Sequence, residues 1–289
     1  MADENLPRSA YDETLLQMAR NTCLTVAEAL CDLMEEHMVV VGGLVPSLLI
    51  PPDAAPPEIG PHPGTRDVDV GLKVAVPKNL YADVKERLKA SEFEPDVNEK
   101  TNNTTWHRWK HKTLPGIKID FLIEPDPSDT NPSVMKQLKG GLSAIKTDAL
   151  HLAFIDFKMI TLGTLEADTT LTGEKAQFTI RVCGPAALIV LKAIAHRDRE
   201  EPKDKDAFDL WYTCTYFGAG PSEVARRLKP LMEDQHSQRA VQILQEDFAE
   251  AGQIGPVKAA RFLGPVDDDA FQADVVAAIG ELLRLITED

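Results

Sequence analysis

The chain has 289 residues, of which 43% are hydrophobic and 27% charged, and its 46 acidic side chains outnumber 31 basic ones to give a formal net charge of −15. This composition is typical of a soluble globular protein of about two domains, and it excludes a disordered or fibrous chain. The negative charge disfavours broad binding to nucleic acid or anionic membranes, but it leaves room for a local basic site or for phosphates bridged to carboxylates by metal ions.

The first 184 residues alternate between helical and strand patterns. Ser9 with Asp12 resembles a capping box, and apolar residues at helical spacing then predict a helix as far as His37. The run from Met38 to Val41 predicts a buried strand that ends in the turn Gly42-Gly43. Further predicted elements are helical turns at 44–50, a helix at 80–90, loops at 51–64 and 124–141, and strands at 65–72, 104–112, 117–123, 152–155, 159–162 and 177–182.

The pattern is helical from Gly184 to the end of the chain. We interpret the acidic run 267–269 as the N-terminal cap of the last helix, because an apolar helical pattern follows it directly. The sequence therefore predicts an α+β fold, with a mixed sheet and flanking helices in a domain at 1–184 and a helical domain at 185–289. The helices of the second domain are predicted at 186–196, 206–216, 222–232, 238–251, 255–262 and 268–285.

The cysteine spacing and the lack of long apolar segments indicate where in the cell the protein resides. Cys23, Cys31, Cys183 and Cys214 show no CxxC spacing, which favours buried free thiols over a zinc site or a disulfide framework. The polar N-terminus lacks the apolar core of a signal peptide, and no apolar run approaches the ~20 residues that cross a bilayer. We therefore expect a reduced, cytoplasmic protein without membrane contact.

Three aspartates in two predicted strands point to chemistry. Asp67 and Asp69 are two residues apart in one strand, so their side chains project to the same face. Asp120 lies in a second apolar strand, and if the two strands are neighbours the three carboxylates converge. Converging carboxylates repel one another and need cations, and oxygen ligands suit Mg²⁺ or Mn²⁺. Two such ions could activate an attacking hydroxyl and hold a leaving pyrophosphate.

Each of these features also has a plainer interpretation. Asp67 and Asp69 could form the solvated face of an amphipathic strand. Gly42-Gly43 lets backbone amides approach a phosphate, with the Ser47 hydroxyl near by, but it could be a tight turn and no more.

The segment 106–112 is the most basic stretch of the chain and contains two tryptophans. It could stack a base or touch an acceptor phosphate. The plainer interpretation is an edge strand whose cations discourage aggregation. Histidines such as His37 and His151 have no metal-ligand spacing, and we expect them to be structural or exposed.

The order of these motifs resembles the DNA polymerase beta-type nucleotidyltransferase superfamily. The similar parts are a strand with a Gly-Gly turn at 39–43, an Asp-x-Asp at 67–69 and a third acid at Asp120. The downstream stretch 185–210, with Lys192 and the run Lys205-Asp206-Ala207-Phe208-Asp209-Leu210, is similar to the signature of AbiEii-like nucleotidyltransferase toxins. The resemblance spans about residues 38 to 211 and implies a nucleotidyltransferase-type sheet, with the C-terminal helices completing the nucleotide site.

The resemblance also implies roles for individual residues. Metal ions would bind Asp67, Asp69 and Asp120, and Asp120 would also be the candidate base for the acceptor hydroxyl. The remaining roles concern the nucleotide: Gly42, Gly43 and Ser47 at the phosphates, Lys192 as a catalytic cation that reaches the phosphates, Arg197 or Arg199 at the triphosphate, and Asp206 and Asp209 as residues that orient Lys192 or contact nucleotide. A Lys-Asp cluster at a helix start is also favoured by capping and the helix dipole alone.

The resulting expectation is a metal-dependent enzyme that moves a nucleoside monophosphate from an NTP to an acceptor hydroxyl and releases pyrophosphate. The resemblance further implies tRNA or a protein as acceptor, a toxin–antitoxin or phage-defence setting and a possible cognate antitoxin. The alternative is a non-catalytic nucleotide- or partner-binding module on the same fold, with the C-terminal helices as its interaction surface. A third possibility is an acidic scaffold without a ligand.

Overall fold

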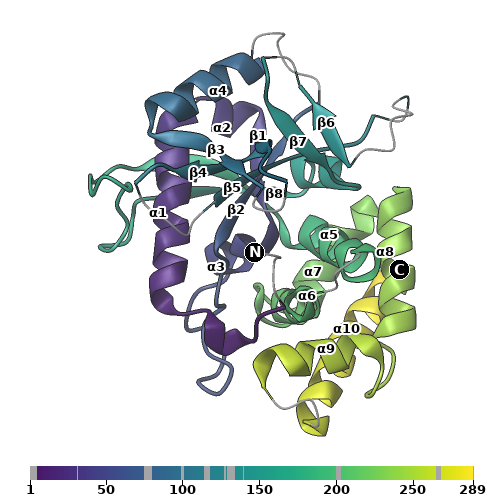
Figure 1. Cartoon of the computed structure of the whole chain (residues 1–289). Coiled ribbons are helices and arrows are strands. Elements are labelled where there is room, and N and C mark those ends of the chain that lie inside the picture. The colour runs from purple at the N-terminus through teal and green to yellow at the C-terminus, as the bar shows by residue number, and fades with distance from the viewer. Residues whose placement is uncertain are drawn as a thin grey trace. The chain divides into compact units, whose positions relative to one another are not determined.

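The computed structural model describes residues 5–30, 32–74, 80–98, 101–113, 118–126, 128, 134–138, 140–199, 203–264 and 268–288 (Figure 1). The fold is α+β, about 50% helical, with an open mixed sheet and flanking helices. Contacts divide the chain into two compact units: unit 1 contains Met1–Asp12, Val45–Pro63 and Gly184–Asp289, and unit 2 contains Glu13–Leu44 and Gly64–Cys183. Cys31, Asp267 and the connection 114–117 between two of the predicted strands lie outside the described residues.

Unit 2 is built on one mixed sheet. In its described part the neighbours are β3-β4-β5-β2-β1-β9-β8, and β7 joins β5 and carries β6. Strands β2 and β5 are parallel, and β1 pairs antiparallel with β2 and parallel with β9. The strands are β1 Met38–Val41, β2 Asp67–Leu72, β3 Phe93–Val97, β4 Thr104–His111, β5 Lys118–Ile123, β6 Met135–Gln137, β7 Ser143–Lys146, β8 Phe157–Leu162 and β9 Phe178–Cys183.

The helices of unit 2 pack on this sheet. Helix α1 (Glu13–Leu30) contacts β9, β2 and α4 (Leu80–Ala90), and α2 (Asp32–Glu36) precedes β1. Cys23, Val26, Ala27 and Leu30 are buried and recur at three- and four-residue spacing, so one stripe of α1 faces the apolar sheet. The 3₁₀ turns η2 (Gly42–Leu44) and η3 (Leu150–Phe154) complete the unit.

The start of the first helix differs from the prediction. Ser9 lies in a separate 3₁₀ turn, η1 (Arg8–Ala10), and α1 begins at Glu13. The segment before α1 is held by contacts within unit 1, since Arg8 Nη2 donates to the carbonyl of Pro61 at 2.9 Å and the Tyr11 ring lies 5.7 Å from that of Phe262. These tertiary contacts outweigh the local capping pattern.

Two further predictions about unit 2 were wrong. Residues 152–154 belong to η3 and Ile155 follows it in a turn, so no strand forms here, because a short apolar run does not distinguish a strand from a buried helical turn. Leu150 of η3 packs so close to Gly71 that a Cβ there would lie 2.9 Å from Leu150 Cδ1. Strands β3 and β7 were not predicted, and β6 lies inside the region expected to be a loop, because these short strands alternate weakly.

Unit 1 is helical in its described part. Helix α5 packs against α6, α7 and α8, and α6 also packs against α9 and α10. Asp268 accepts a hydrogen bond from the Phe271 amide at 3.0 Å, which confirms that the acidic run caps the last helix. The helices are α3 Val45–Leu49, α5 Pro185–Asp198, α6 Asp204–Tyr216, α7 Pro221–Leu228, α8 Gln235–Asp247, α9 Ile254–Leu263 and α10 Asp269–Thr287, with a 3₁₀ turn, η4, at Lys229–Leu231.

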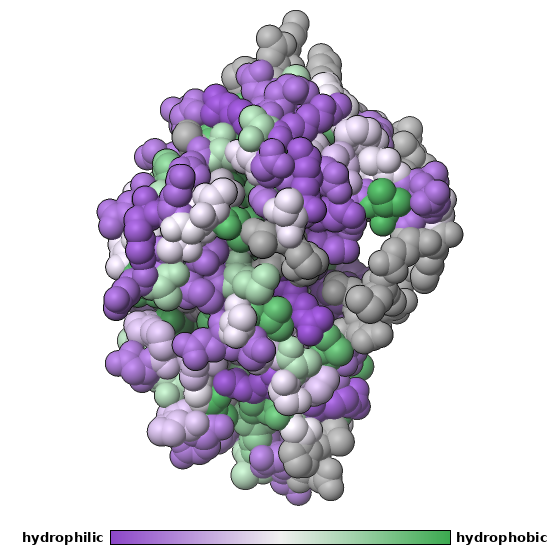
Figure 2. Space-filling model, turned by 60° about the vertical axis from the view of Figure 1, so that its left-hand side comes forward, coloured by the Kyte–Doolittle hydropathy of each residue, from purple (hydrophilic) through white to green (hydrophobic). Residues whose placement is uncertain are grey.

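The described cysteines are buried free thiols, as expected, and the surface is mainly hydrophilic on the face shown in Figure 2. Cys23, Cys183 and Cys214 are free and buried, and burial is the main cause that raises the pKa of Cys23 and of Cys214 to about 12. On the face shown in Figure 2 hydrophilic side chains predominate and hydrophobic ones are scattered. Among the described residues, no helix has the length and apolar character that crossing a membrane requires.

Candidate functional site

The carboxylate cluster, defined as Asp67, Asp69 and Asp120, lies in unit 2. Strands β2 and β5 are paired in parallel, with Asp69 opposite Asp120 and Asp67 opposite Lys118. Residues opposite each other in a parallel pair point to the same face, and so do residues two apart in one strand. The condition set in the sequence analysis, that these two strands are neighbours, is met, and all three side chains lie on one face of the sheet.

The Gly42 turn directly adjoins this cluster. Strand β1 pairs with β2 so that Val41 lies opposite Asp69, and the next residue, Gly42, has a φ of +75°. A Cβ built on Gly42 would lie 1.9 Å from Asp69 Oδ2. Glycine is therefore required at position 42 for two reasons, the left-handed backbone and the close approach of the Asp69 carboxylate.

Arg108 of β4 supplies a positive charge to the carboxylate cluster. Its Nε and Nη2 donate to the two oxygens of Asp120 at 2.7 Å and 2.5 Å, and Nη2 lies 3.7 Å from Asp67 Oδ2. As the described residues lie, the three carboxylates do not each bring an oxygen within 4.8 Å of the other two. The Arg108 guanidinium thus supplies part of the positive charge that these carboxylates were expected to receive from metal ions.

The structure shows that the edge-strand interpretation of the segment 106–112 is wrong, and it removes one of the two tryptophans from the stacking interpretation. Strand β4 lies between β3 and β5, so it is not an edge strand. Trp109 is completely buried and cannot stack a base. The charge of Arg108 is directed at Asp120, and Lys110 lies 3.5 Å from Asp96, so these two cations have partners within the sheet.

The buried ion-pair cluster, defined as His62, Lys192, Arg199, Lys205, Asp206 and Asp209, lies in unit 1. Lys192 Nζ, on α5, is 2.7 Å from Asp206 Oδ1 and 2.6 Å from Asp209 Oδ2, both on α6. Asp206 and Asp209 are one turn apart, so both face α5. The predicted association of Lys192 with the two aspartates is present. The alternative explanation of the Lys-Asp run, capping of the helix, is not supported by a side-chain hydrogen bond at the N-cap of α6.

Two members of this cluster were missed. Lys205 Nζ donates to both oxygens of Asp209 at 2.7 Å and 3.0 Å, and His62 Nε2 lies 2.9 Å from Asp209 Oδ1. His62 also stacks on Phe208, with ring centroids 5.8 Å apart. The i,i+4 spacing of Lys205 and Asp209 could have indicated the first pair. Nothing in the proline-rich loop 51–64 marks its histidine as buried.

The pKa directions follow from burial and from these ion pairs. Burial opposes the charge of Asp209, but Lys192 and Lys205 outweigh burial and hold the pKa of Asp209 well below its ordinary value. Burial likewise opposes the charge of Lys192, and Asp206 and Asp209 outweigh it and raise the pKa of Lys192. Burial, with the charge of Lys205, lowers the pKa of His62 to about 4, so the neutral imidazole donates from Nε2 to Asp209.

Arg197 and Arg199, the two alternatives for the triphosphate contact, have different partners in the structure. Arg199 Nη1 lies 2.9 Å from Asp206 Oδ2, so Arg199, although exposed itself, pairs with a buried member of the ion-pair cluster. Arg197 instead pairs with Glu246 at 2.9 Å and with Asp247 at 2.8 Å on α8. The remaining predicted phosphate contacts fall in different units, since Gly43 is buried in η2 of unit 2 and Ser47 is half-buried in α3 of unit 1.

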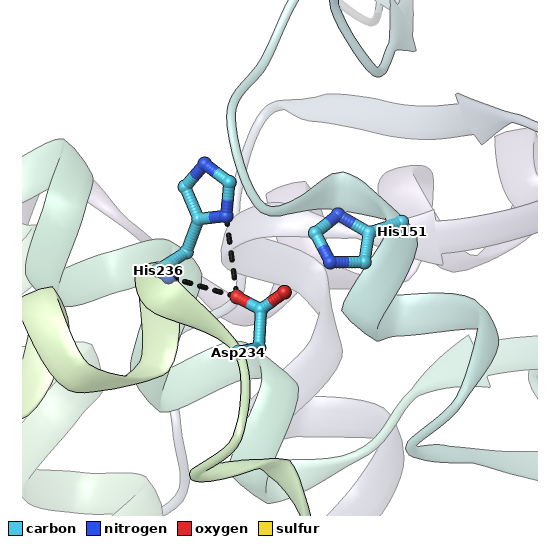
Figure 3. A group of neighbouring side chains, drawn as sticks. All are labelled: His151, Asp234 and His236. Atoms are coloured by element: carbon cyan, nitrogen blue, oxygen red, sulfur yellow. Dashed lines mark hydrogen bonds and ion pairs between the residues drawn. The ribbon is translucent and has the colours of Figure 1, made fainter.

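The histidines drawn in Figure 3 have local roles. Asp234 Oδ1 caps α8 by accepting from the His236 amide at 2.8 Å, and it lies 3.2 Å from His236 Nδ1. His151 belongs to unit 2, where its Nδ1 is 3.1 Å from Glu124 Oε1 and its amide donates to Glu124 Oε2.

Comparisons of this chain with protein-family models and with curated proteins find no match.

Proposed function

We propose that this chain is a metal-dependent nucleotidyltransferase that moves a nucleoside monophosphate from an NTP to an acceptor hydroxyl. The observation that carries the proposal is the pairing of Asp69 with Asp120 on parallel strands, with the Gly42 turn directly against Asp69. The resemblance of the motif order to the nucleotidyltransferase superfamily supports the same reaction. It also suggests tRNA or a protein as acceptor, and a toxin–antitoxin or phage-defence role with a cognate antitoxin.

The carboxylate cluster fits a divalent cation in the chemistry of its ligands. All three side chains offer oxygen, which Mg²⁺ and Mn²⁺ prefer, and the cluster already accommodates one cation, the Arg108 guanidinium. Asp67, Asp69 and Asp120 would hold the metal, and Arg108 would move from Asp120 when it binds. A metal bound there supplies the positive charge that stabilises the triphosphate and the departing pyrophosphate.

The proposed reaction assigns tasks to this chain's own residues. The acceptor oxygen forms a bond to the α-phosphorus, the bond between that phosphorus and the bridging oxygen to the β-phosphate breaks, and pyrophosphate leaves with the electron pair. Asp120 takes the proton of the acceptor hydroxyl. Lys192 and Arg199 are proposed to contact phosphate, and their ion pairs with Asp206 and Asp209 support a positioning role for those two aspartates.

The test is transfer of label from α-labelled NTPs to tRNA or to lysate proteins in the presence of Mg²⁺ or Mn²⁺. We expect Asp69→Asn to abolish the transfer, because it removes a charge from the proposed metal site while preserving shape. Asp148→Asn changes an exposed aspartate of the same unit and should transfer label like the unsubstituted chain. Equal transfer by Asp69→Asn and the unsubstituted chain, or transfer that persists in EDTA, would refute the proposal.

The Arg108 contact favours a second candidate, a nucleotide- or partner-binding module that does not use metal. If Arg108 is the permanent counter-ion of Asp120, the carboxylate cluster is neutralised without a metal ion. If Arg108 is exchangeable, removing it leaves the carboxylates with excess negative charge and strengthens metal binding.

Titration with Mn²⁺, followed by electron paramagnetic resonance, distinguishes the two candidates. For the nucleotidyltransferase we expect Arg108→Ala to bind Mn²⁺ about tenfold more tightly, in line with the loss of one nearby positive charge in a partly buried site. Lys110→Ala is the matched control on the same strand, since Lys110 pairs with Glu94 and Asp96 instead. An absence of Mn²⁺ binding in both the unsubstituted chain and Arg108→Ala would favour the non-catalytic module.

A further inference from the structure

A pocket opens in unit 2 where β5 changes its neighbour. Strand β4 pairs with β5 as far as Asp120, where Arg108 is its partner, and β7 takes over at Leu122, opposite Ile145. The first half of β4, starting at Thr104, therefore separates from β5. A pocket of about 220 Å³ lies between this part of β4 and the β6–β7 hairpin.

A β-bulge produces the same opening from the other side of β4. In the pairing of β3 with β4, Pro95 lies opposite Trp109 and the next residue, Asp96, lies opposite Thr105. Residues 106–108 are therefore extra residues of the bulged strand. Bulges re-aim side chains, and this one directs Arg108 to Asp120 while Trp106 and His107 line the pocket. The pocket and the Arg108–Asp120 contact thus lie at the same irregular part of β4.

Most side chains that line the pocket are polar and uncharged. Its lining includes Asn98, Asn103, Trp106, His107, Gln137 and Ser143. His107 is its one titratable group among the described residues, and burial is the main cause that lowers its pKa, so the imidazole is neutral at pH 7. Ser143 donates to Gln137 Oε1 at 2.9 Å, which fixes the orientation of that amide.

Such a lining suits a flat, uncharged ring with donors and acceptors on its edge. Trp106 is half-buried and supplies an aromatic surface, and Lys85 Nζ lies 4.5 Å from its ring centroid. Amide and hydroxyl groups supply both donors and acceptors. A phosphate would find no cationic side chain among the described lining residues, whereas a ring of this kind needs none.

We propose that this pocket binds a nucleobase beside the carboxylate cluster, with Trp106 stacking on the base and the amide side chains contacting its edge. The inference rests on the proposed function, since it names the part of the nucleotide that this face of unit 2 receives. His107, which lines the pocket, directly precedes Arg108, whose guanidinium donates to Asp120, so the pocket adjoins the proposed reaction centre. The base belongs either to the NTP or to an unpaired position of an RNA acceptor.

The test is calorimetric titration of the full chain with adenosine, guanosine, cytidine and uridine, in the absence of metal. We expect at least one nucleoside to bind, and Trp106→Ala to weaken its binding by about tenfold or more, which is the size of effect that loss of base–aromatic stacking produces. Trp106→Phe keeps an aromatic face and should restore most of the affinity. Lys110→Ala, on the same strand but outside the lining, should bind like the unsubstituted chain.

Further arms separate the two sources of the base and protect the test against misfolding. Competition of the nucleoside with NTP identifies the NTP base, and competition with a short single-stranded RNA identifies an acceptor base. Gln137→Ala alters an exposed side chain, keeps the fold, and should weaken binding severalfold if the amide contacts the base.

The proposal is overturned if none of the four nucleosides binds, or if Trp106→Ala and Gln137→Ala, both folded by circular dichroism, bind as tightly as the unsubstituted chain. Metal-free nucleoside binding without any label transfer would retain the pocket and reject the transferase. Label transfer that neither Trp106→Ala nor Gln137→Ala changes would support the transferase and reject the pocket.

Discussion

Replacing Asp209 with alanine is expected to lower the free energy of unfolding by about 3–5 kcal/mol, the usual effect of removing one partner from a buried ion pair. Asp209 is fully buried, and its carboxylate is the shared partner of Lys192, Lys205 and His62. Without it Lys205 loses the carboxylate it contacts, and Lys192 keeps only Asp206. Urea unfolding of the full chain at pH 7, followed by circular dichroism, measures the loss.

The matched control is Glu281→Gln, which breaks an exposed ion pair with Arg284 and should leave stability nearly unchanged. The pH dependence gives a second check. Because the folded pKa of Asp209 is depressed, its contribution is present above the unfolded pKa of about 4 and is lost as the pH falls further. Asp209→Ala should therefore lose less stability on acidification than the unsubstituted chain. An effect no larger than that of Glu281→Gln would contradict the buried ion-pair cluster.

Gly42→Ala should destabilise the chain by about 2 kcal/mol or more and should also abolish label transfer. A left-handed backbone costs alanine roughly 1–2 kcal/mol. In addition, the new methyl group would meet Asp69 Oδ2 at 1.9 Å, so the carboxylate must move from its place opposite Asp120. Thermal unfolding and the labelled-NTP assay measure the two effects.

Gly173→Ala isolates the contribution of this contact. Gly173 lies in the same unit with a φ of +86°, and a Cβ added there would meet nothing within 4 Å. Both substitutions impose a left-handed alanine, but Gly42→Ala alone displaces Asp69. If the two variants unfold at the same temperature and transfer label equally well, the Gly42 turn has no special relation to the carboxylate cluster.

The residues with strong local patterns were predictable. Val39 to Val41 and the alternation from Asp67 to Val70 define β1 and β2, because β-branched residues and period-two spacing act locally. That β2 and β5 would be neighbours required the assumption that similar motifs share a topology, and the sheet agrees with it. Strand β3 could not be seen in this way, because Pro95 interrupts it and its pairing with β4 is bulged.

The partners of the charged residues were less predictable than the strands. Arg108 was recognised as part of a basic segment, but its contact with Asp120 depends on the register of β4 against β5. Likewise, His62 contacts Asp209 although 147 positions separate them in the sequence, and periodic patterns within a segment do not predict contacts between such distant segments. Local patterns therefore identified where charges lie, whereas tertiary pairing decided what they neutralise.

The division into units has a consequence for how this protein can be taken apart. The chain passes from one unit to the other after Asp12, Leu44, Pro63 and Cys183. A fragment that begins at Gly184 therefore lacks the segments 1–12 and 45–63 of its own unit, and with them the histidine that contacts Asp209. Truncation at the apparent border would leave both pieces incomplete, so any minimal autonomous version must be built by rejoining discontinuous segments rather than by cutting the gene once.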